Sequence, residues 1–153
     1  MLENFFQPGE EGERKWSELA LRLEESTDTM AAEGISLVAG REAFDDLLHT
    51  MGNELGLFDT GFRMQPLRRR VLRGIQILSE WMNDGWDLRS SVTGGGEVIT
   101  IHFPDPFENF QVYFIEGLLQ GMLSWISGGK FYPVTVDHSD EGVKLSTARD
   151  PID

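Results

Sequence analysis

The sequence contains no cysteine among its 153 residues. This absence excludes disulfide bonds, thiol nucleophiles and thiolate metal sites together, and it is typical of proteins in a reducing compartment. The chain also lacks a basic N-terminal segment followed by an apolar core, which is the pattern of a secretory signal. We therefore expect a cytoplasmic protein.

Basic side chains are scarce. Lysine and arginine number 13 against 26 acidic residues, which gives a net charge of −13. A surface of this sign repels phosphate backbones, so we expect no general nucleic-acid binding. Residues 1–60 hold 14 acidic and 4 basic side chains, whereas residues 61–90 hold 6 basic and 3 acidic ones. The ordinary interpretation of the acidity is solubility.

The sequence also lacks an apolar run long enough to span a membrane. Residues 112–126, VYFIEGLLQGMLSWI, are apolar on nearly every side of a helix, but they number 15 and include Glu116. A bilayer needs about 20 apolar residues, so this segment predicts the enclosed central helix of a soluble domain. Gly117 and Gly121 predict the close approach of a neighbouring helix or strand, and secondarily of a ligand or partner subunit.

Other helices are predicted from apolar residues at helical spacing. Residues 1–10 form a flexible tail in this interpretation, and residues 11–153 form a single domain. Helices are expected over residues 11–27, 41–55 and 66–83, the last with Pro66 at its first position. The apolar run at residues 35–39 is compatible with a strand or a helix.

Period-two patterns predict two β-hairpins. Residues 86–92 and 97–103 flank a glycine-rich turn, and residues 131–137 and 142–147 flank a turn at residues 138–141. The predicted fold class is α+β, with helices packed on a small antiparallel sheet made of two hairpins and a central apolar helix between them.

Four arginines cluster in the first turns of the helix predicted from Pro66: Arg68, Arg69, Arg70 and Arg73. Cations there oppose the helix dipole, at a cost of about 0.3–1 kcal/mol per exposed charge. Two interpretations remain open. The arginines pair with the acidic N-terminal helices, or they capture a phosphate or carboxylate group of a ligand or partner.

Glu116 lies in the apolar central helix, one turn before Gln120 on the same face. A buried carboxylate must find a partner, reach water or become protonated. Glu116 is therefore either a polar anchor or proton donor facing a pocket, or a structural group that caps a loop, pairs with an arginine or reaches solvent. Aromatic side chains gather in the second half of the chain, where most are expected in the core and a few could line a pocket.

Catalytic and metal-binding motifs are absent. The histidines His49, His102 and His138 do not have the paired spacing of a metal-binding helix. No serine lies in a nucleophile elbow, and the glycines at residues 94–96 lack the lysine and following helix of a phosphate-binding loop. We expect no metal and no cofactor.

Several short motifs occur in a recognisable order from about Gly34 to the end. They are residues 40–44 (GREAF) with 55–56 (LG), residues 83–86 (NDGW), residues 99–103 (ITIHF), the aromatic-x-x-x-Gly-x-x-x-Gly pattern of residues 113–123, and residues 134–136 and 143–145. In this order the sequence resembles the four-vinyl reductase domain, which belongs to the same broad fold group as the TRAPP vesicle-tethering subunits.

The resemblance implies a small α+β domain that usually dimerises and often encloses a hydrophobic pocket. In that family the pocket is associated with small hydrophobic molecules, tetrapyrrole-related compounds or lipid chains, commonly for sensing or delivery. Family members often carry metal-linked cysteines in the final hairpin, but residues 131–149 contain none. No metal ligand is therefore carried over.

The leading hypothesis is a non-catalytic, dimeric domain that binds or senses a tetrapyrrole-like or lipid-like molecule. Six side chains are its candidate ligand contacts: Arg70, Arg73, Trp81, His102, Tyr113 and Glu116. One alternative is a dimeric protein-interaction scaffold that recognises a partner through the arginine cluster and the acidic N-terminal region. A second alternative is an enzyme acting on a tetrapyrrole-type substrate, with Glu116 or His102 as proton donor.

Overall fold

The structure is a computed structural model that describes residues 29–94, 96–105 and 107–152. The predicted tail over residues 1–10 and the predicted helix over residues 11–27 lie outside these ranges. The described helices are α2 (Thr29–Met51), α3 (Thr60–Arg63), α4 (Leu67–Gly85) and α5 (Asn109–Ser127), and the strands are β1 (Ser91–Thr93), β2 (Val98–Phe103), β3 (Val134–Ser139) and β4 (Gly142–Ala148). The predicted α+β class, with helices packed on a small antiparallel sheet, is confirmed.

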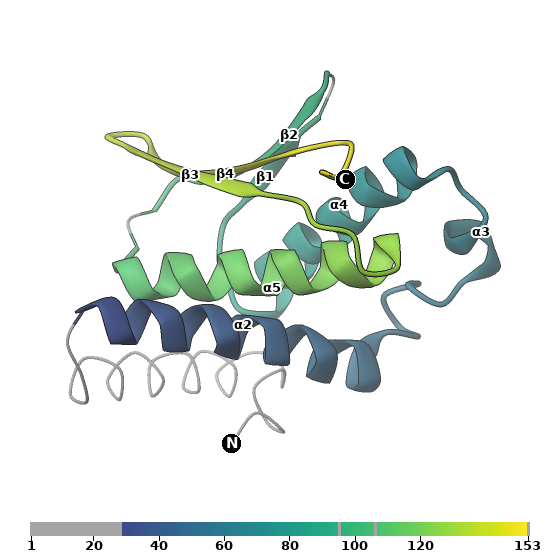
Figure 1. Cartoon of the computed structure of the whole chain (residues 1–153), viewed down its shortest axis with the longest axis horizontal. Helices are drawn as coiled ribbons and strands as arrows, with labels where there is room; N and C mark the ends of the chain where they lie inside the picture. Colours follow the sequence, from purple (N-terminus) through teal and green to yellow (C-terminus); the bar gives the residue numbers. More distant parts are fainter. Residues whose placement is uncertain (1–28, 95, 106, 153) are drawn as a thin grey trace.

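The four strands form one sheet in the order β1-β2-β4-β3, and all neighbours are antiparallel. The helices lie on one side of this sheet, with α5 between the sheet and α2 (Figure 1). Alternation along β2 places Ile99, Ile101 and Phe103 in the core. The opposite face is mostly polar, and there the hydroxyl groups of Thr100 in β2 and Ser146 in β4 form a hydrogen bond of 2.8 Å.

Helix α5 confirms the predicted central helix and extends it slightly at both ends. At its start, the backbone N–H of Glu108 donates to Oε1 of Gln111 at 2.9 Å. At its end, Gly128 adopts a left-handed conformation with φ 73°, which stops the helix. The side chains of α5 that are buried in the core are Phe110, Val112, Phe114, Ile115, Leu118, Leu119, Met122, Leu123 and Ile126.

Glycines bring the backbones of α2 and α5 into direct contact. A Cβ atom added at Gly40 would clash with the backbone carbonyl oxygen of Phe114, and one added at Gly117 would clash with that of Leu37. A Cβ atom at Gly121 would lie 3.1 Å from the Cβ atom of Phe44. The predicted close approach of a helix at Gly117 and Gly121 is therefore confirmed.

The helix predicted over residues 41–55 begins earlier and ends earlier. Helix α2 starts at Thr29 and takes in the apolar run at residues 35–39, which is therefore helical. The buried side of its first half consists of the small residues Ser36 and Gly40, while Ile35 and Val38 are exposed. Close packing on α5 requires small residues there, so the apolar pattern does not mark the buried face.

Other predicted boundaries were wrong near residue 86. Trp86 follows α4 as its C-cap and is buried against Trp81, with ring centroids 4.8 Å apart, instead of starting a strand. The chain changes direction at Asp87, whose φ is 54°, and β1 is limited to three residues. Three smaller differences lie elsewhere in the chain. Pro66 is the N-cap of α4 and not its first residue, and the short helix α3 was not predicted. The strand expected from residue 131 begins at Val134.

We expect Gly117→Ala to lower the free energy of unfolding by about 2–3 kcal/mol, because the new methyl group forces α2 and α5 apart. Gly34→Ala is the matched control on α2, because a Cβ atom there meets no atom within 4 Å. It should stabilise the helix by up to about 1 kcal/mol. Urea unfolding of the three proteins measures both effects, and equal stability of the Gly117→Ala variant and wild type would contradict the role of this contact.

Candidate functional site

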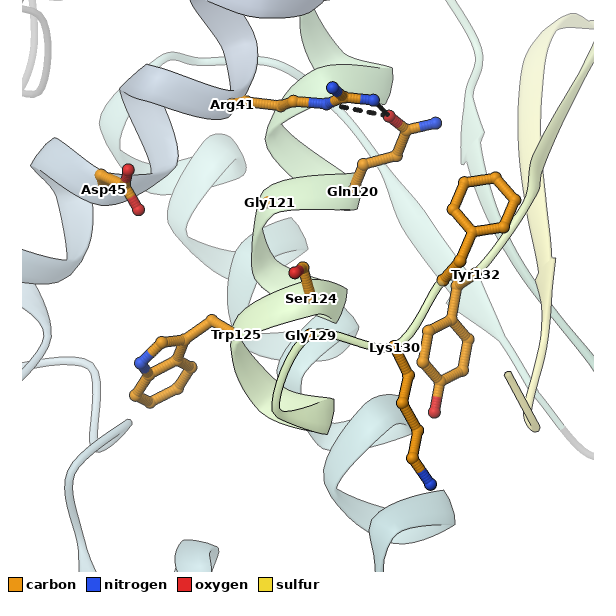
Figure 2. A pocket seen from close by; sticks show the side chains of 10 residues that line it. Arg41, Asp45, Gln120, Gly121, Ser124, Trp125, Gly129, Lys130 and Tyr132 are labelled. Atoms are coloured by element: carbon orange, nitrogen blue, oxygen red, sulfur yellow. Dashed lines mark hydrogen bonds between the residues drawn. The ribbon is translucent and has the colours of Figure 1, made fainter. Parts of the chain in front are cut away.

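A groove of about 460 Å³ lies beside the C-terminal half of α5, between that helix, α2 and the segment that leads to β3. We call it the α5 groove. Its lining is Arg41, Asp45, Gln120, Gly121, Ser124, Trp125, Gly129, Lys130, Phe131 and Tyr132. Figure 2 shows Arg41 and Lys130 far apart in this lining, with Ser124 between them.

Arg41 enters the groove from α2 and binds Gln120 of α5. Its Nη2 and Nε atoms donate to the side-chain oxygen of Gln120 at 2.6 and 3.2 Å (Figure 2). Among the described residues Arg41 makes no ion pair with a carboxylate. The amide orients the guanidinium group without neutralising it, so the charge remains available to an anion.

Lys130 supplies a second cation. The chain reverses after α5 at Gly128 and Gly129, both with positive φ, and Ser127 Oγ accepts the backbone N–H of Lys130 at 3.0 Å. The exposed ammonium group of Lys130 has no ion pair within the described parts of the chain. Two cations thus line one groove with no carboxylate partner in the part of the chain that the structure describes, in a protein of net charge −13.

Three aromatic side chains form the apolar part of the α5 groove. Trp125 is half-buried and meets the rings of Phe44 and Phe58, with centroids 6.2 and 5.8 Å away. Phe131 is exposed, whereas Tyr132 is buried and its hydroxyl group has no hydrogen-bond partner in the described chain. Burial raises the pKa of Tyr132, the nearby Asp150 raises it further, and Arg70 opposes the shift.

Two of the predicted contacts lie on the surface of α5 that leads into the groove. Tyr113, Glu116, Gln120 and Ser124 follow one another at helical spacing, but only Gln120 and Ser124 line the groove. Burial raises the pKa of Glu116, and the positive charge of Arg41 partly opposes this shift. Glu116 is therefore a half-buried carboxyl group near Arg41, outside the groove itself.

The arginine cluster is bonded mostly within the described chain. Arg68 pairs with Glu97 at 2.7 Å and with Asp150 at 3.3 Å, and Arg73 pairs with Glu80 at 3.5 Å. These acids lie in the second half of the chain or in α4 itself, so no pair among the described residues joins the cluster to α2. The acidic helix predicted over residues 11–27 lies outside the described residues. Arg69 has no partner among the described residues.

The hydrogen bonds of Arg70 offset part of the unfavourable interaction between the arginines and the positive end of the α4 dipole. Its Nη1 atom donates to the backbone carbonyl of Ile126 at 3.0 Å, and its Nε atom donates to that of Gln65 at 3.0 Å. Ile126 belongs to the last turn of α5, where carbonyl groups lack helical partners and the dipole is negative. Arg70 therefore has a structural role at the end of α5.

The remaining predicted contacts lie in two other places. Arg73 and Trp81 line a second groove of about 480 Å³, which we call the α4 groove, together with Met51, Glu54, Leu55, Ile77, Glu80, Asp84 and Gly85. His102 lies on the outer face of the sheet, where its Nε2 atom is 2.8 Å from the backbone oxygen of Glu141. The six predicted residues therefore do not line one groove: Arg73 and Trp81 share the α4 groove, and Tyr113 and Glu116 are neighbours on the surface of α5.

Sequence reasoning missed Arg41 and Lys130 as groove residues. Gln120 was a usable signal, because an amide in an otherwise apolar helix needs a polar partner. The position of Lys130, directly after the Gly128-Gly129 pair that ends α5, was a second signal, because it places this side chain next to the end of the central helix.

No family model matches the sequence, and no curated protein matches it. The resemblance to the four-vinyl reductase domain therefore stays a prediction. None of the described helices is both long and apolar enough to cross a membrane. Within the described ranges, no group of three or more histidine, aspartate and glutamate side chains is placed to hold a metal ion.

We expect Glu116→Gln to stabilise the protein more at about pH 7 than at about pH 4. A raised pKa in the folded chain means that ionisation of Glu116 is penalised by folding. The penalty is absent below the pKa of the unfolded chain, grows as pH rises between the two pKa values, and is complete above the folded one. Urea unfolding at both pH values measures it. Glu42→Gln, an exposed charge on α2, is the control, and a gain that is the same at both pH values would contradict the assignment.

Proposed function

We propose that this chain is a non-catalytic binding or sensing module for an amphipathic small molecule, lipid-like or tetrapyrrole-like, that carries an anionic group. The observation that carries the proposal is the α5 groove, in which Arg41 and Lys130 have no carboxylate partner among the described residues and lie with three aromatic side chains. The volume of about 460 Å³ lies within the range of roughly 300–1,000 Å³ that is usual for small-molecule sites.

The two kinds of lining divide the ligand into two parts. An acyl chain or a flat ring would lie against Trp125 and Phe131, which offer apolar surface beside the groove. A carboxylate would bind the Arg41 guanidinium group, which Gln120 already orients through two hydrogen bonds. Lys130 would hold a second polar group or the opposite end of the ligand.

Asp45 limits which anions can bind. Its carboxylate lines the same groove on the α2 side, one helical turn after Arg41 (Figure 2). A ligand with several negative charges, such as a polyphosphate, would meet this carboxylate as well as the cations. The lining therefore favours a molecule with one or two carboxylates and a large apolar body.

A second part of the proposal is that the chain forms a homodimer. Ile35 and Val38 on α2 are 48% and 52% exposed, and they lie one turn apart on the same helix surface. Exposed apolar side chains that adjoin one another offer a surface that a partner subunit can cover. The arginine cluster is not proposed as a partner surface, because three of its four members bond within the chain.

We expect decanoate to bind more tightly than 1-decanol, and Arg41→Gln combined with Lys130→Gln to remove this difference. A charge-assisted hydrogen bond contributes about 1.5 kcal/mol or more, so loss of the cation that binds the carboxylate should weaken decanoate binding about tenfold. Tryptophan fluorescence and calorimetric titration measure the affinities. Protoporphyrin IX, titrated in the same way, separates a flat dicarboxylate ligand from an acyl chain.

Arg63→Gln combined with Arg69→Gln is the matched control for that titration, because both arginines are exposed and line neither groove. It should leave the affinities unchanged. Equal loss in the two double variants, or equal affinity of wild type for decanoate and 1-decanol, would contradict an anion-binding site in the α5 groove. Native mass spectrometry of the purified protein would identify any molecule that remains bound.

We expect Val38→Lys to weaken the dimer about tenfold or more, because a lysine in an apolar contact must be desolvated. Val98→Lys is the matched control, since Val98 is exposed to 53% on the outer face of the sheet. Sedimentation equilibrium of both variants and wild type measures the dissociation constants. A wild-type chain that stays monomeric at all concentrations would exclude the homodimer.

A further inference from the structure

The α4 groove combines an apolar floor with an acidic rim. Its volume is about 480 Å³, and it shares no lining residue with the α5 groove. The floor is formed by Met51, Leu55, Ile77, Trp81 and Gly85, and the charged residues around it are Glu54, Arg73, Glu80 and Asp84. Apolar and charged groups are thus arranged for an amphipathic partner.

The groove follows the direction of α4. Ile77, Trp81 and Gly85 recur every four residues, so they occupy one surface of the helix over about 12 Å. Glu80 and Asp84 lie beside them, one turn apart. The end of α2 and the turn after it supply the opposite wall. An elongated groove of about two helical turns suits a segment of polypeptide.

Among the described residues, the rim of the α4 groove has more carboxylates than cations to pair with them. Arg73 pairs with Glu80 at 3.5 Å, so this cation is already compensated. Glu54 and Asp84 are exposed and make no ion pair among the described residues. The net charge of −13 adds a long-range attraction for cations. The groove is therefore complementary to a basic partner.

We propose that the α4 groove is a docking site for a basic amphipathic helix of a partner protein. Apolar side chains on one face of that helix would cover Leu55 and Ile77, and lysines or arginines beside this face would pair with Glu54 and Asp84. This partner differs from the ligand of the α5 groove in both size and charge. The inference therefore holds or fails independently of the proposed function.

The test uses the full chain and a synthetic helical peptide of about 14 residues, roughly four turns long. The peptide carries leucines on one face and lysines on the rest, and a second peptide has glutamate at every lysine position. We expect the lysine peptide to bind, with affinity falling steeply between low salt and about 0.5 M sodium chloride. The glutamate peptide should not bind.

Two variants distinguish peptide binding in the α4 groove from binding that follows the net negative charge of the protein. Glu54→Gln combined with Asp84→Asn should weaken binding of the lysine peptide about fivefold to tenfold, because two exposed ion pairs are lost. Leu55→Ala should weaken it about threefold or more and leave the salt dependence unchanged. The control, Glu42→Gln combined with Asp137→Asn, removes two exposed carboxylates outside the groove and should bind as wild type does.

Several results would overturn the proposal. Binding of the lysine peptide that is equal in wild type and the Glu54/Asp84 variant would place the peptide elsewhere. Equal weakening by the control variant would mean that binding follows net charge alone. Self-association of the wild-type chain that the Glu54/Asp84 variant abolishes would assign the groove to a second copy of this chain.

Discussion

The backbone contact between α2 and α5 is the constraint on which the rest of the structure depends. Gly40 and Gly117 face the backbone of the opposite helix at positions where a methyl group would not fit. This contact fixes the position of Arg41, the residue after Gly40, so that its guanidinium group reaches Gln120. The α5 groove is therefore a consequence of how closely two helices pack.

The central helix presents different residue types to each of its neighbours. Large apolar side chains such as Phe114 and Leu118 fill the core, and Gly117 and Gly121 meet α2. The narrow surface left over carries Glu116 and Gln120. A helix that is apolar on nearly all sides is thus covered by different elements on its different sides. Its few polar residues lie on the narrow surface that these elements leave uncovered.

The sequence predicts the elements whose buried face is made of large apolar residues. The periodicity of α4, the continuous apolar run of α5 and the alternation of β2 identify these elements, because burial selects large apolar residues such as Ile, Leu, Phe and Met at their buried positions. The first half of α2 is not recognisable in this way, because its buried face is Ser36 and Gly40. The prediction that a strand starts at Trp86 was wrong, because a buried aromatic residue fits the C-cap position of a helix equally well.

The candidate sites were less predictable than the fold. Arg41 and Gln120 are 79 positions apart in sequence, and nothing local to either residue indicates the other. One interpretation of the arginine cluster was a binding site. In the structure, Arg68 and Arg73 form ion pairs within the chain, and Arg70 caps the end of α5. Only Arg73 and Trp81, eight residues apart on α4, were both predicted and found in one groove.

The hydrogen bond from Arg70 to Ile126 has a consequence for how the chain folds. It joins the first turn of α4 to the last turn of α5, which are 56 positions apart. The last turn of α5 is followed directly by Gly128 and Gly129, whose conformational freedom disfavours the helical state at this end. The carbonyl groups of Ser124 and Trp125 accept the backbone N–H groups of Gly129 and Gly128, whereas that of Ile126 accepts Arg70 and gains this bond only after α4 has docked. The end of this turn therefore acquires part of its order from tertiary assembly and not from local helix propensity alone.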